Sequence, residues 1–207
     1  MTVDMGDLAL LGLAVMCLAV FARLLLGVVK GQAMGIDKLG QVLFVERLRA
    51  PVLTVAMRAI SNLASAPFII GVLLAAFTWA PCKRQVILGA LNVGAVTAID
   101  QLLKAIVRRP RPEGSRLVEA PGLGFPSGHS MAAMTFYGYG ICLARSGVCL
   151  FPSSVVTVEA LVCVILAVGV SRIYLGVHYA SDVLGGFCLA LAWLTLFVRL
   201  TVPFIAA

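Results

Sequence analysis

Two apolar runs flank a short polar segment in residues 153–205, SSVVTVEALVCVILAVGVSRIYLGVHYASDVLGGFCLALAWLTLFVRLTVPFI. Each run approaches the roughly 20 apolar residues that a helix needs to cross a bilayer. Between and beside the runs lie four polar residues that the membrane interior would not solvate: Ser171, Arg172, His178 and Asp182. Ionisable side chains next to membrane helices are costly to bury, so this pattern predicts a helical membrane protein with a functional site at one membrane surface.

The composition of the whole chain agrees with a membrane protein. Its 207 residues are 61% hydrophobic and 12% charged, with a mean hydropathy of +1.06. Soluble domains have about 45–50% apolar and about 25% charged residues, so a disordered chain, a collagen and an ordinary soluble enzyme are excluded. The net charge is +7. Such an excess serves topology, contact with anionic lipid or an anionic substrate, and composition does not separate these uses.

We predict an all-α, polytopic membrane protein with six transmembrane helices in one bundle, forming a single domain over residues 1–207. The candidate spans are residues 8–29, 64–80, 85–107, 128–143, 153–173 and 181–205. We interpret the cysteines as small hydrophobic residues packed among helices, because there is no C-x-x-C spacing and four of them lie inside apolar runs. These cysteines are Cys17, Cys82, Cys142, Cys149, Cys163 and Cys188.

Two longer polar segments interrupt the spans. Residues 30–62 combine charges with apolar residues at helical spacing, which predicts one or two amphipathic helices at the interface. Pro51 favours two, because proline ends or kinks a helix. Residues 108–127 contain too many prolines for a helix, so we predict an irregular loop.

Three polar clusters stand at ends of the predicted spans. Because successive spans alternate in direction, all three clusters fall on one membrane face. They are Lys104 with Arg111 and Pro112, then Pro126-Ser127-Gly128-His129, then Ser171-Arg172 with His178 and Asp182. The conjunction of these clusters, rather than any single one, favours a functional site.

The cations and the helix start at residue 128 suit a phosphate group. Arginine offers a planar fork for phosphate oxygens, and lysine offers a point charge. Backbone N–H groups at a helix start form a further anion site, for which we expect Ser127 as N-cap and Gly128 to allow close approach. The predicted phosphate ligands are Lys104, Arg111, Ser127, Gly128 and Arg172.

The histidines supply the predicted chemistry. Asp182 follows His178 by four residues, so it can accept a hydrogen bond from one ring nitrogen and leave the other free as a nucleophile. His129 comes from a different helix and can protonate the leaving group. We therefore predict a phosphohistidine intermediate that water hydrolyses. We expect no cofactor and no metal, because the two histidines and one aspartate lack plausible zinc-ligand spacing.

Some of these residues also have simpler interpretations. Lys104 lies four residues after Asp100, so the two can form an intrahelical ion pair. We interpret Arg108, Arg109 and Arg116 as surface charges that meet phospholipid head groups.

These clusters resemble the signature of the type 2 phosphatidic acid phosphatase family of integral membrane lipid phosphatases. That signature, K-x6-R-P, P-S-G-H and S-R-x5-H-x3-D, is complete and in order within residues 104–182. The resemblance implies His178 as nucleophile, His129 as acid and Asp182 as the partner of His178. It also implies phosphate binding by the five ligands named above.

The resemblance further implies a membrane lipid substrate: phosphatidic acid, phosphatidylglycerophosphate or an isoprenyl diphosphate such as undecaprenyl diphosphate. The compact chain is similar to small bacterial members acting on the last two. A lipid phosphotransferase of the same fold and a non-catalytic protein that binds or carries anionic lipid stay open as alternatives. The expected partners are the substrate and the phospholipid bilayer, with no nucleic acid, and the sequence leaves the oligomeric state open.

The resemblance implies a multi-pass protein of the plasma or inner membrane, with the active face extracytoplasmic and both termini inside. The distribution of positive charge opposes this orientation, because residues 30–62 and 108–127 carry more of it than the opposite face. The positive-inside rule is best counted over short connections, and these two segments are the long ones. We therefore expect an extracytoplasmic site.

Overall fold

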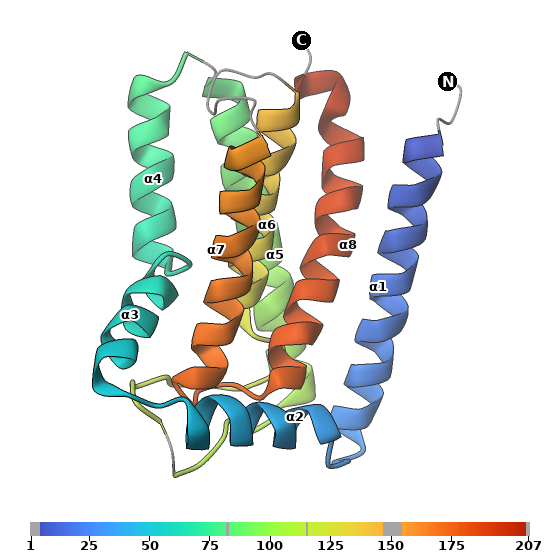
Figure 1. The fold of residues 1–207 in the computed structure, drawn as a ribbon. Helices are drawn as coiled ribbons and strands as arrows, with labels where there is room; N and C mark the ends of the chain where they lie inside the picture. The colour runs from blue at the N-terminus through green and yellow to red at the C-terminus, as the bar shows by residue number, and fades with distance from the viewer. Residues whose placement is uncertain (1–4, 82, 115, 147–154, 206–207) are drawn as a thin grey trace.

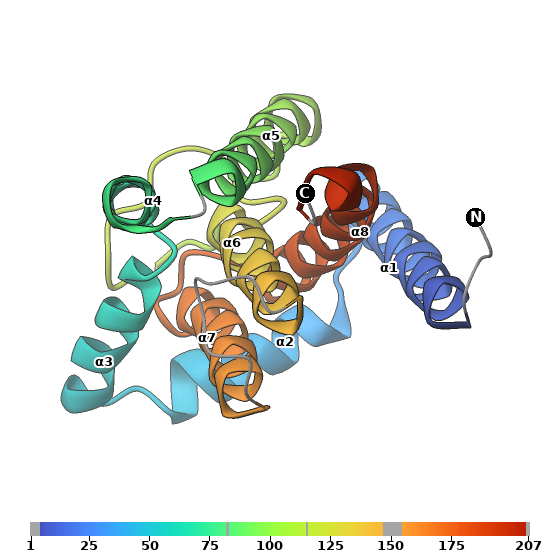
Figure 2. The same ribbon diagram turned by 90° about the horizontal axis from the view of Figure 1, so that it is seen from above.

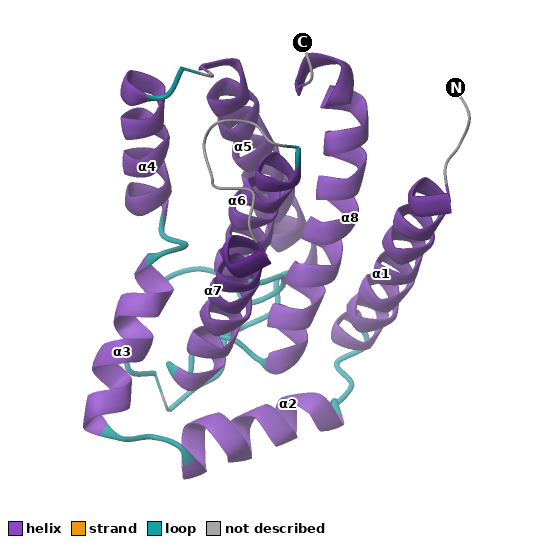
Figure 3. Ribbon diagram, turned by 45° about the horizontal axis from the view of Figure 1, so that its top comes forward, coloured by secondary structure: helices purple, strands orange, loops and turns teal. Residues whose placement is uncertain are grey.

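The computed structural model describes residues 5–81, 83–114, 116–146 and 155–205, and every regular element in these ranges is a helix (Figure 3). In chain order the helices are α1 (Met5–Val29), α2 (Gly35–Gly40), the π-helical η1 (Gln41–Arg47), α3 (Pro51–Asn62), α4 (Ala66–Trp79), α5 (Lys83–Val107), α6 (Gly128–Arg145), α7 (Val155–Tyr174) and α8 (Ala180–Ile205). The all-α prediction is confirmed for the described residues.

The long helices run side by side and present apolar surface for a bilayer. Four of them are long and apolar enough to cross a membrane, namely Leu8–Val29 of α1, α5, α7 and Ala180–Thr201 of α8. Helices α3 and α4 also qualify when they are taken together as one span bent by 51°. Length and apolarity thus give four spans, or five with the bent pair, against the six predicted.

Helix α6 is the predicted span that this criterion omits, and its position explains why. Viewed from above, α6 stands in the middle of the bundle (Figure 2), where it contacts α5, α7 and α8. Half of its residues are buried, including Ser130 and Thr135. A helix surrounded by protein does not need the apolarity of one that faces lipid.

The outer helices attach to this centre on different sides. Helix α1 contacts α8 at the edge of the bundle, α4 contacts α5, and α3 contacts α7 (Figure 2). Close helix packing depends on small residues at some crossings. A Cβ on Gly169 of α7, for example, would collide with the ring of Phe187 on α8.

One end of the bundle is covered by the two polar segments. Helix α2 continues into η1 and lies across this end, whereas α1 begins and α8 ends at the other end (Figure 1). Pro51 begins α3 after residues 48–50, so the segment 30–62 forms two helical pieces, as Pro51 favoured. The described residues between α5 and α6 form an irregular loop, as predicted.

The described cysteines, Cys17, Cys142, Cys163 and Cys188, form no disulfide. Cys17 and Cys188 are buried between α1 and α8, as predicted, whereas Cys163 is exposed on α7. Cys82 and Cys149 lie outside the described residues.

Candidate active site

The three polar clusters meet at the end of the bundle that α2 covers. There a cavity of about 1140 Å³ is lined by residues from every cluster: Lys104, Arg111, Gly128, His129, Arg172 and His178. Ser127 and Asp182 are fully buried behind this lining. The predicted convergence on one face is therefore found in the structure.

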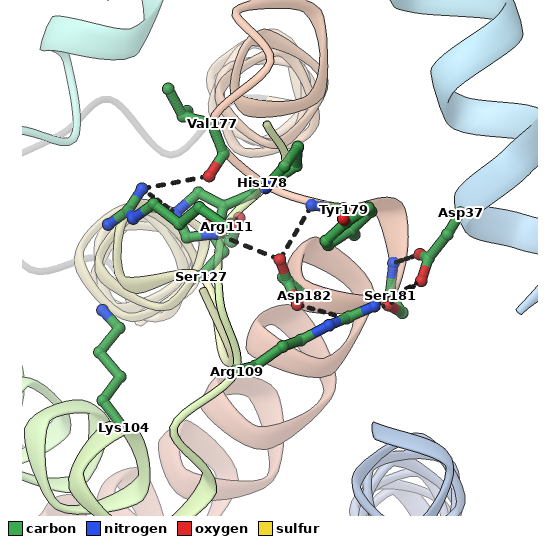
Figure 4. A network of polar contacts seen from close by, with 12 residues as sticks. Asp37, Lys104, Arg109, Arg111, Ser127, Val177, His178, Tyr179, Ser181 and Asp182 are labelled. Carbon is green, nitrogen blue, oxygen red and sulfur yellow. Dashed lines mark hydrogen bonds and ion pairs between the residues drawn. The ribbon is translucent and has the colours of Figure 1, made fainter. Parts of the chain in front are cut away.

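The loop after α5 brings Arg111 into the site. Arg108, with φ +51°, ends the helix and turns the chain. Arg111 then donates to the carbonyl oxygen of Val177 at 3.2 Å and to that of Gly122 at 3.2 Å. Its guanidinium is thereby held beside the segment that carries His178 (Figure 4).

The hydrogen bond between Arg111 and His178 fixes the tautomer of the imidazole. Arg111 Nη1 lies 3.2 Å from His178 Nε2. Because a guanidinium can only donate, Nε2 must accept and the ring proton must reside on Nδ1. The Nε2 lone pair therefore faces the cation that the sequence assigns to the phosphate.

Asp182 faces the other ring nitrogen, as predicted, but at a longer distance than expected. His178 Nδ1 lies 3.4 Å from Asp182 Oδ2, which is longer than an ordinary N–H···O hydrogen bond. Within the described residues, Nδ1 has no hydrogen-bond partner. Contacts between catalytic groups often shorten when the substrate binds.

The surroundings of His178 keep it neutral. Burial lowers its pKa to about 4, while the neighbouring Asp182 carboxylate acts in the opposite direction. The imidazole is thus unprotonated at neutral pH, as a nucleophile requires.

The other two predicted phosphate cations also have protein partners. Lys104 Nζ lies 2.7 Å from Asp100 Oδ2 on the same helix, so the simple ion-pair interpretation holds while Lys104 also lines the cavity. Arg172 is only 6% exposed. It donates through Nη1 to Ser61 Oγ of α3 at 2.5 Å.

The start of α6 differs in one respect from the prediction. Ser127 occupies the N-cap position, but its side chain makes no capping hydrogen bond. Its Oγ instead accepts a hydrogen bond from Ser130 Oγ at 2.9 Å, and its backbone N–H donates to the Asp182 carbonyl at 3.0 Å. Ser127 is therefore the N-cap residue, as predicted, but the expected capping hydrogen bond is not formed, because the Ser127 hydroxyl pairs with Ser130.

Gly128 brings the start of α6 close to Lys104 and its partner Asp100. A Cβ at this position would lie 2.8 Å from Asp100 Oδ2 and 3.1 Å from Lys104 Nζ. The absence of a side chain therefore leaves room for the Asp100–Lys104 pair at the start of α6, while the close approach of a phosphate to Gly128 stays a prediction.

The interpretation of Arg109 as a surface charge is wrong. Its side chain is 14% exposed, and Nη1 lies 2.6 Å from Asp182 Oδ1. Burial alone would lower the pKa of Arg109, but Asp182 and Asp37 more than offset it and raise the pKa. Arg108 and Arg116 are exposed, as predicted.

Sequence reasoning also missed Asp37 of α2. Its Oδ2 lies 2.8 Å from Arg109 Nη2, and Ser181 on α8 donates to both of its oxygens. Asp37 is one of several charges in an amphipathic segment, and no motif marks it. Only the tertiary structure brings it to residues more than 70 positions away.

Comparison with known proteins agrees with this geometry. Residues 85–205, which contain the three clusters, match the sequence model of the PAP2 superfamily. The chain belongs to the PAP2 superfamily. It is 32% identical to phosphatidylglycerophosphatase B of Bacillus subtilis over 150 residues, which cover 70% of this chain and 73% of that protein.

Solved structures show the same PAP2 fold. The first transmembrane PAP2-type phosphatidylglycerolphosphate phosphatase from Bacillus subtilis superposes with a TM-score of 0.79 at 26% identity, covering 92% of this chain and 96% of that one. Aquifex aeolicus LpxE superposes with a TM-score of 0.62 at 23% identity, covering 78% and 93%. The chain is therefore a multi-pass PAP2 membrane lipid phosphatase, a phosphoric ester hydrolase, and the predicted family is confirmed.

Proposed function

We propose that this PAP2 phosphatase removes the terminal phosphate of phosphatidylglycerophosphate, with His178 as nucleophile and His129 as general acid. The observation that carries the proposal is the cavity, which joins the polar clusters to an apolar wall. That wall consists of small and branched residues of α4 and α5: Ile69, Ile70, Leu73, Ala90, Val93 and Gly94. It can take the start of an acyl chain while the head group reaches His178.

In the first step, Nε2 of His178 attacks phosphorus in line with the leaving oxygen. The N–P bond forms as the P–O bond to the lipid breaks, and His129 gives its proton to the departing alkoxide. Asp182 orients His178 and stabilises its positive charge. Lys104, Arg111 and Arg172, with the backbone of Ser127 and Gly128, hold the phosphoryl oxygens.

In the second step, water attacks the phosphohistidine. His129, now neutral, takes the proton of the water, the N–P bond breaks, and its electrons return to Nε2. Free phosphate leaves, and His129 is again protonated for the next cycle. Neither step requires a metal or a cofactor.

The similarity to the Bacillus subtilis phosphatases supports phosphatidylglycerophosphate over the other lipids that the family uses. Undecaprenyl diphosphate and phosphatidic acid carry the same terminal phosphate, and the cations of the site would bind it equally. We therefore infer that the specificity arises beyond the phosphate, at Arg58, Gln101 and Glu119, which also line the cavity.

We further propose one domain of six crossings in the plasma or inner membrane. Helix α6 and the bent pair α3–α4 then join the four apolar spans. The even number is supported by the start of α1 and the end of α8, which both lie at the end opposite α2 (Figure 1). On this topology, the family's orientation makes the α2 end extracytoplasmic.

Phosphate release in detergent tests the substrate and the mechanism together. Purified protein is given phosphatidylglycerophosphate, phosphatidic acid and undecaprenyl diphosphate with excess chelator. We expect the highest kcat/KM with the first, inhibition by vanadate, and loss of activity in His178→Ala. Full activity of His178→Ala would overturn the mechanism, and a preference for either other lipid would overturn the substrate. Phosphate on an acceptor lipid, without free phosphate, would indicate a transferase.

Cysteine labelling of intact cells tests the sidedness. In a variant with its native cysteines replaced by alanine, we introduce Arg116→Cys at the α2 end. The matched variant is Lys83→Cys at the other end. We expect a membrane-impermeant maleimide to label the first only. Labelling of the second only would place the active site inside the cell.

A further inference from the structure

Beyond the predicted nucleophile, acid and phosphate ligands, a buried ionic chain extends from the active site to α2. It runs from Asp182 through Arg109 to Asp37, and the hydroxyl of Ser181 accepts from Arg109 and donates to Asp37 (Figure 4). None of these contacts involves a residue to which we assign phosphate binding.

The first link fixes the carboxylate of Asp182. Its Oδ1 accepts from Arg109 Nη1 at 2.6 Å, and its Oδ2 accepts from the backbone N–H of Tyr179 at 2.9 Å. Together these bonds set the plane of the carboxylate, and they turn Oδ2 toward His178 Nδ1, 3.4 Å away. Asp182 is fully buried, so its charge needs such a partner.

The second link fixes Arg109 itself. Nη2 donates to Asp37 Oδ2 at 2.8 Å, and the guanidinium lies 4.3 Å from the centre of the Tyr179 ring. Tyr179 directly follows His178 in the chain. Arg109 is thus held by Asp182, Asp37 and the Tyr179 ring. It contacts one member of the catalytic pair, Asp182, and the neighbour of the other.

The third link joins this arrangement to α2. Asp37 Oδ1 accepts from the backbone N–H of Ser181 at 2.8 Å, and Oδ2 accepts from its hydroxyl at 2.9 Å. The first turn of α8, which carries Asp182, is therefore anchored to a helix 144 residues earlier in the chain.

We propose that Arg109 and Asp37 are positioning residues that hold Asp182 in register with His178, and that α2 is thereby part of the catalytic apparatus. This role rests on the proposed function of His178. It differs from simple structural support, because Arg109 also balances the charge of Asp182 beside the nucleophile.

The charged groups around His178 determine what a test must show. Asp182 faces it from α8, Arg111 from the loop and Arg172 from α7, while His129 stands nearby on α6. Removing the positive charge of Arg109 leaves Asp182 unbalanced, and this favours the protonated imidazole. Arg109→Lys keeps this positive charge, and Asp37→Asn leaves Arg109 in place, so neither substitution favours the protonated imidazole.

The test compares Arg109→Gln, Arg109→Lys and Asp37→Asn with the exposed neighbour Arg108→Gln as control. Kinetics on the phospholipid substrate are measured with His129 intact. His178 is titrated separately by NMR, in a His129→Gln background without a histidine tag, so that one histidine remains. For Arg109→Gln we expect kcat to fall on the order of 100-fold, as for a misplaced catalytic group, with KM unchanged. The pKa of His178 should rise.

Arg109→Lys should lower kcat less than Arg109→Gln and leave the pKa of His178 unchanged. Asp37→Asn should lower kcat without raising the pKa of His178. Arg108→Gln should behave as the unaltered chain. Wild-type kcat in Arg109→Gln would overturn the proposal. So would a loss of activity that merely follows the amount of folded protein while the pKa of His178 stays fixed. Inactivity of the unaltered chain would refute the proposed function instead, and the NMR titration would still report on Arg109.

Discussion

At the scale of single residues, the protonation of His178 decides whether the site can react. The imidazole is 3% exposed, and burial is the main reason that its pKa is lowered to about 4. An ordinary histidine titrates near 6.5. The folded site therefore holds a neutral nucleophile well into the acidic range.

His178 should titrate near pH 4 in the folded protein. The chain contains two histidines, so a His129→Gln variant with selectively labelled histidine gives a single imidazole signal. Because the pKa is lowered, protonation starts only as the pH falls far below 6.5, and it removes the lone pair of Nε2. A signal that titrates near 6.5 while circular dichroism shows a folded helical protein would contradict this expectation.

Gly128→Ala should impair phosphate binding. The added Cβ would lie 2.8 Å from Asp100 Oδ2, so the Asp100–Lys104 pair must move away from the start of α6. We expect kcat/KM to fall by at least tenfold, about 1.4 kcal/mol. Gly71→Ala on α4 is the matched control, since nothing lies within 4 Å of its Cβ. Equal kinetics of the two variants would show that Gly128 is not needed for the close approach.

At the scale of elements, Tyr174 at the end of α7 binds the start of α3. The hydroxyl of Tyr174 accepts from the Ala50 backbone N–H at 2.9 Å and donates to the Ala50 carbonyl, and Thr54 Oγ1 lies 3.0 Å from it. Helix α3 also carries Ser61, which holds Arg172. The attachment therefore links an outer helix to a phosphate ligand.

Tyr174→Phe should lower thermal stability. The change removes the hydrogen bonds between the Tyr174 hydroxyl and the partly buried start of α3, which costs about 0.5–1.5 kcal/mol for each bond and corresponds to a fall in Tm of a few degrees for a chain of this size. Unfolding in detergent micelles, followed by circular dichroism, measures the shift. Thr78→Val is the control, because Thr78 bonds only within its own helix. An unchanged Tm in Tyr174→Phe would argue against the attachment.

The elements also show what sequence can and cannot predict here. The three motifs lie at helix ends, and alternating helix direction was enough to place His129, His178 and Lys104 on one face. The apolarity criterion does not identify α6 as a membrane span, because protein rather than lipid surrounds that helix. Asp37 and Arg109 were missed because their contact depends on how α2 packs on α8, and no local spacing encodes that.

At the scale of the whole molecule, the bundle is divided between tight and open regions. Helices α6, α7 and α8 pack closely, with His129 on α6 and His178 in the connection between α7 and α8, whereas α4 stands apart and contacts α5 (Figure 2). The cavity lies on this open side, between the polar end and the apolar faces of α4 and α5. A lipid can occupy it with its head group at His178 and its tail toward the bilayer.

Leu73→Trp should obstruct the lipid but not a small phosphate ester. Leu73 lines the cavity, whereas its neighbour Leu74 is 62% exposed and does not. We expect Leu73→Trp to raise KM several-fold for a long-chain lipid phosphate and to leave turnover of a short, water-soluble phosphate ester unchanged. Leu74→Trp should alter neither. Equal losses on both substrates would place the tail elsewhere.

Each of the three proposed phosphate cations has a protein partner, and this pairing bears on how a catalytic cycle ends. Lys104 pairs with Asp100, Arg172 with Ser61 and Arg111 with His178, so on the proposed mechanism each partner competes with the product for its cation. Tight retention of the product would not accelerate the reaction. We therefore expect inorganic phosphate to inhibit only weakly, with an inhibition constant well above the KM of the lipid, and turnover to continue as phosphate accumulates.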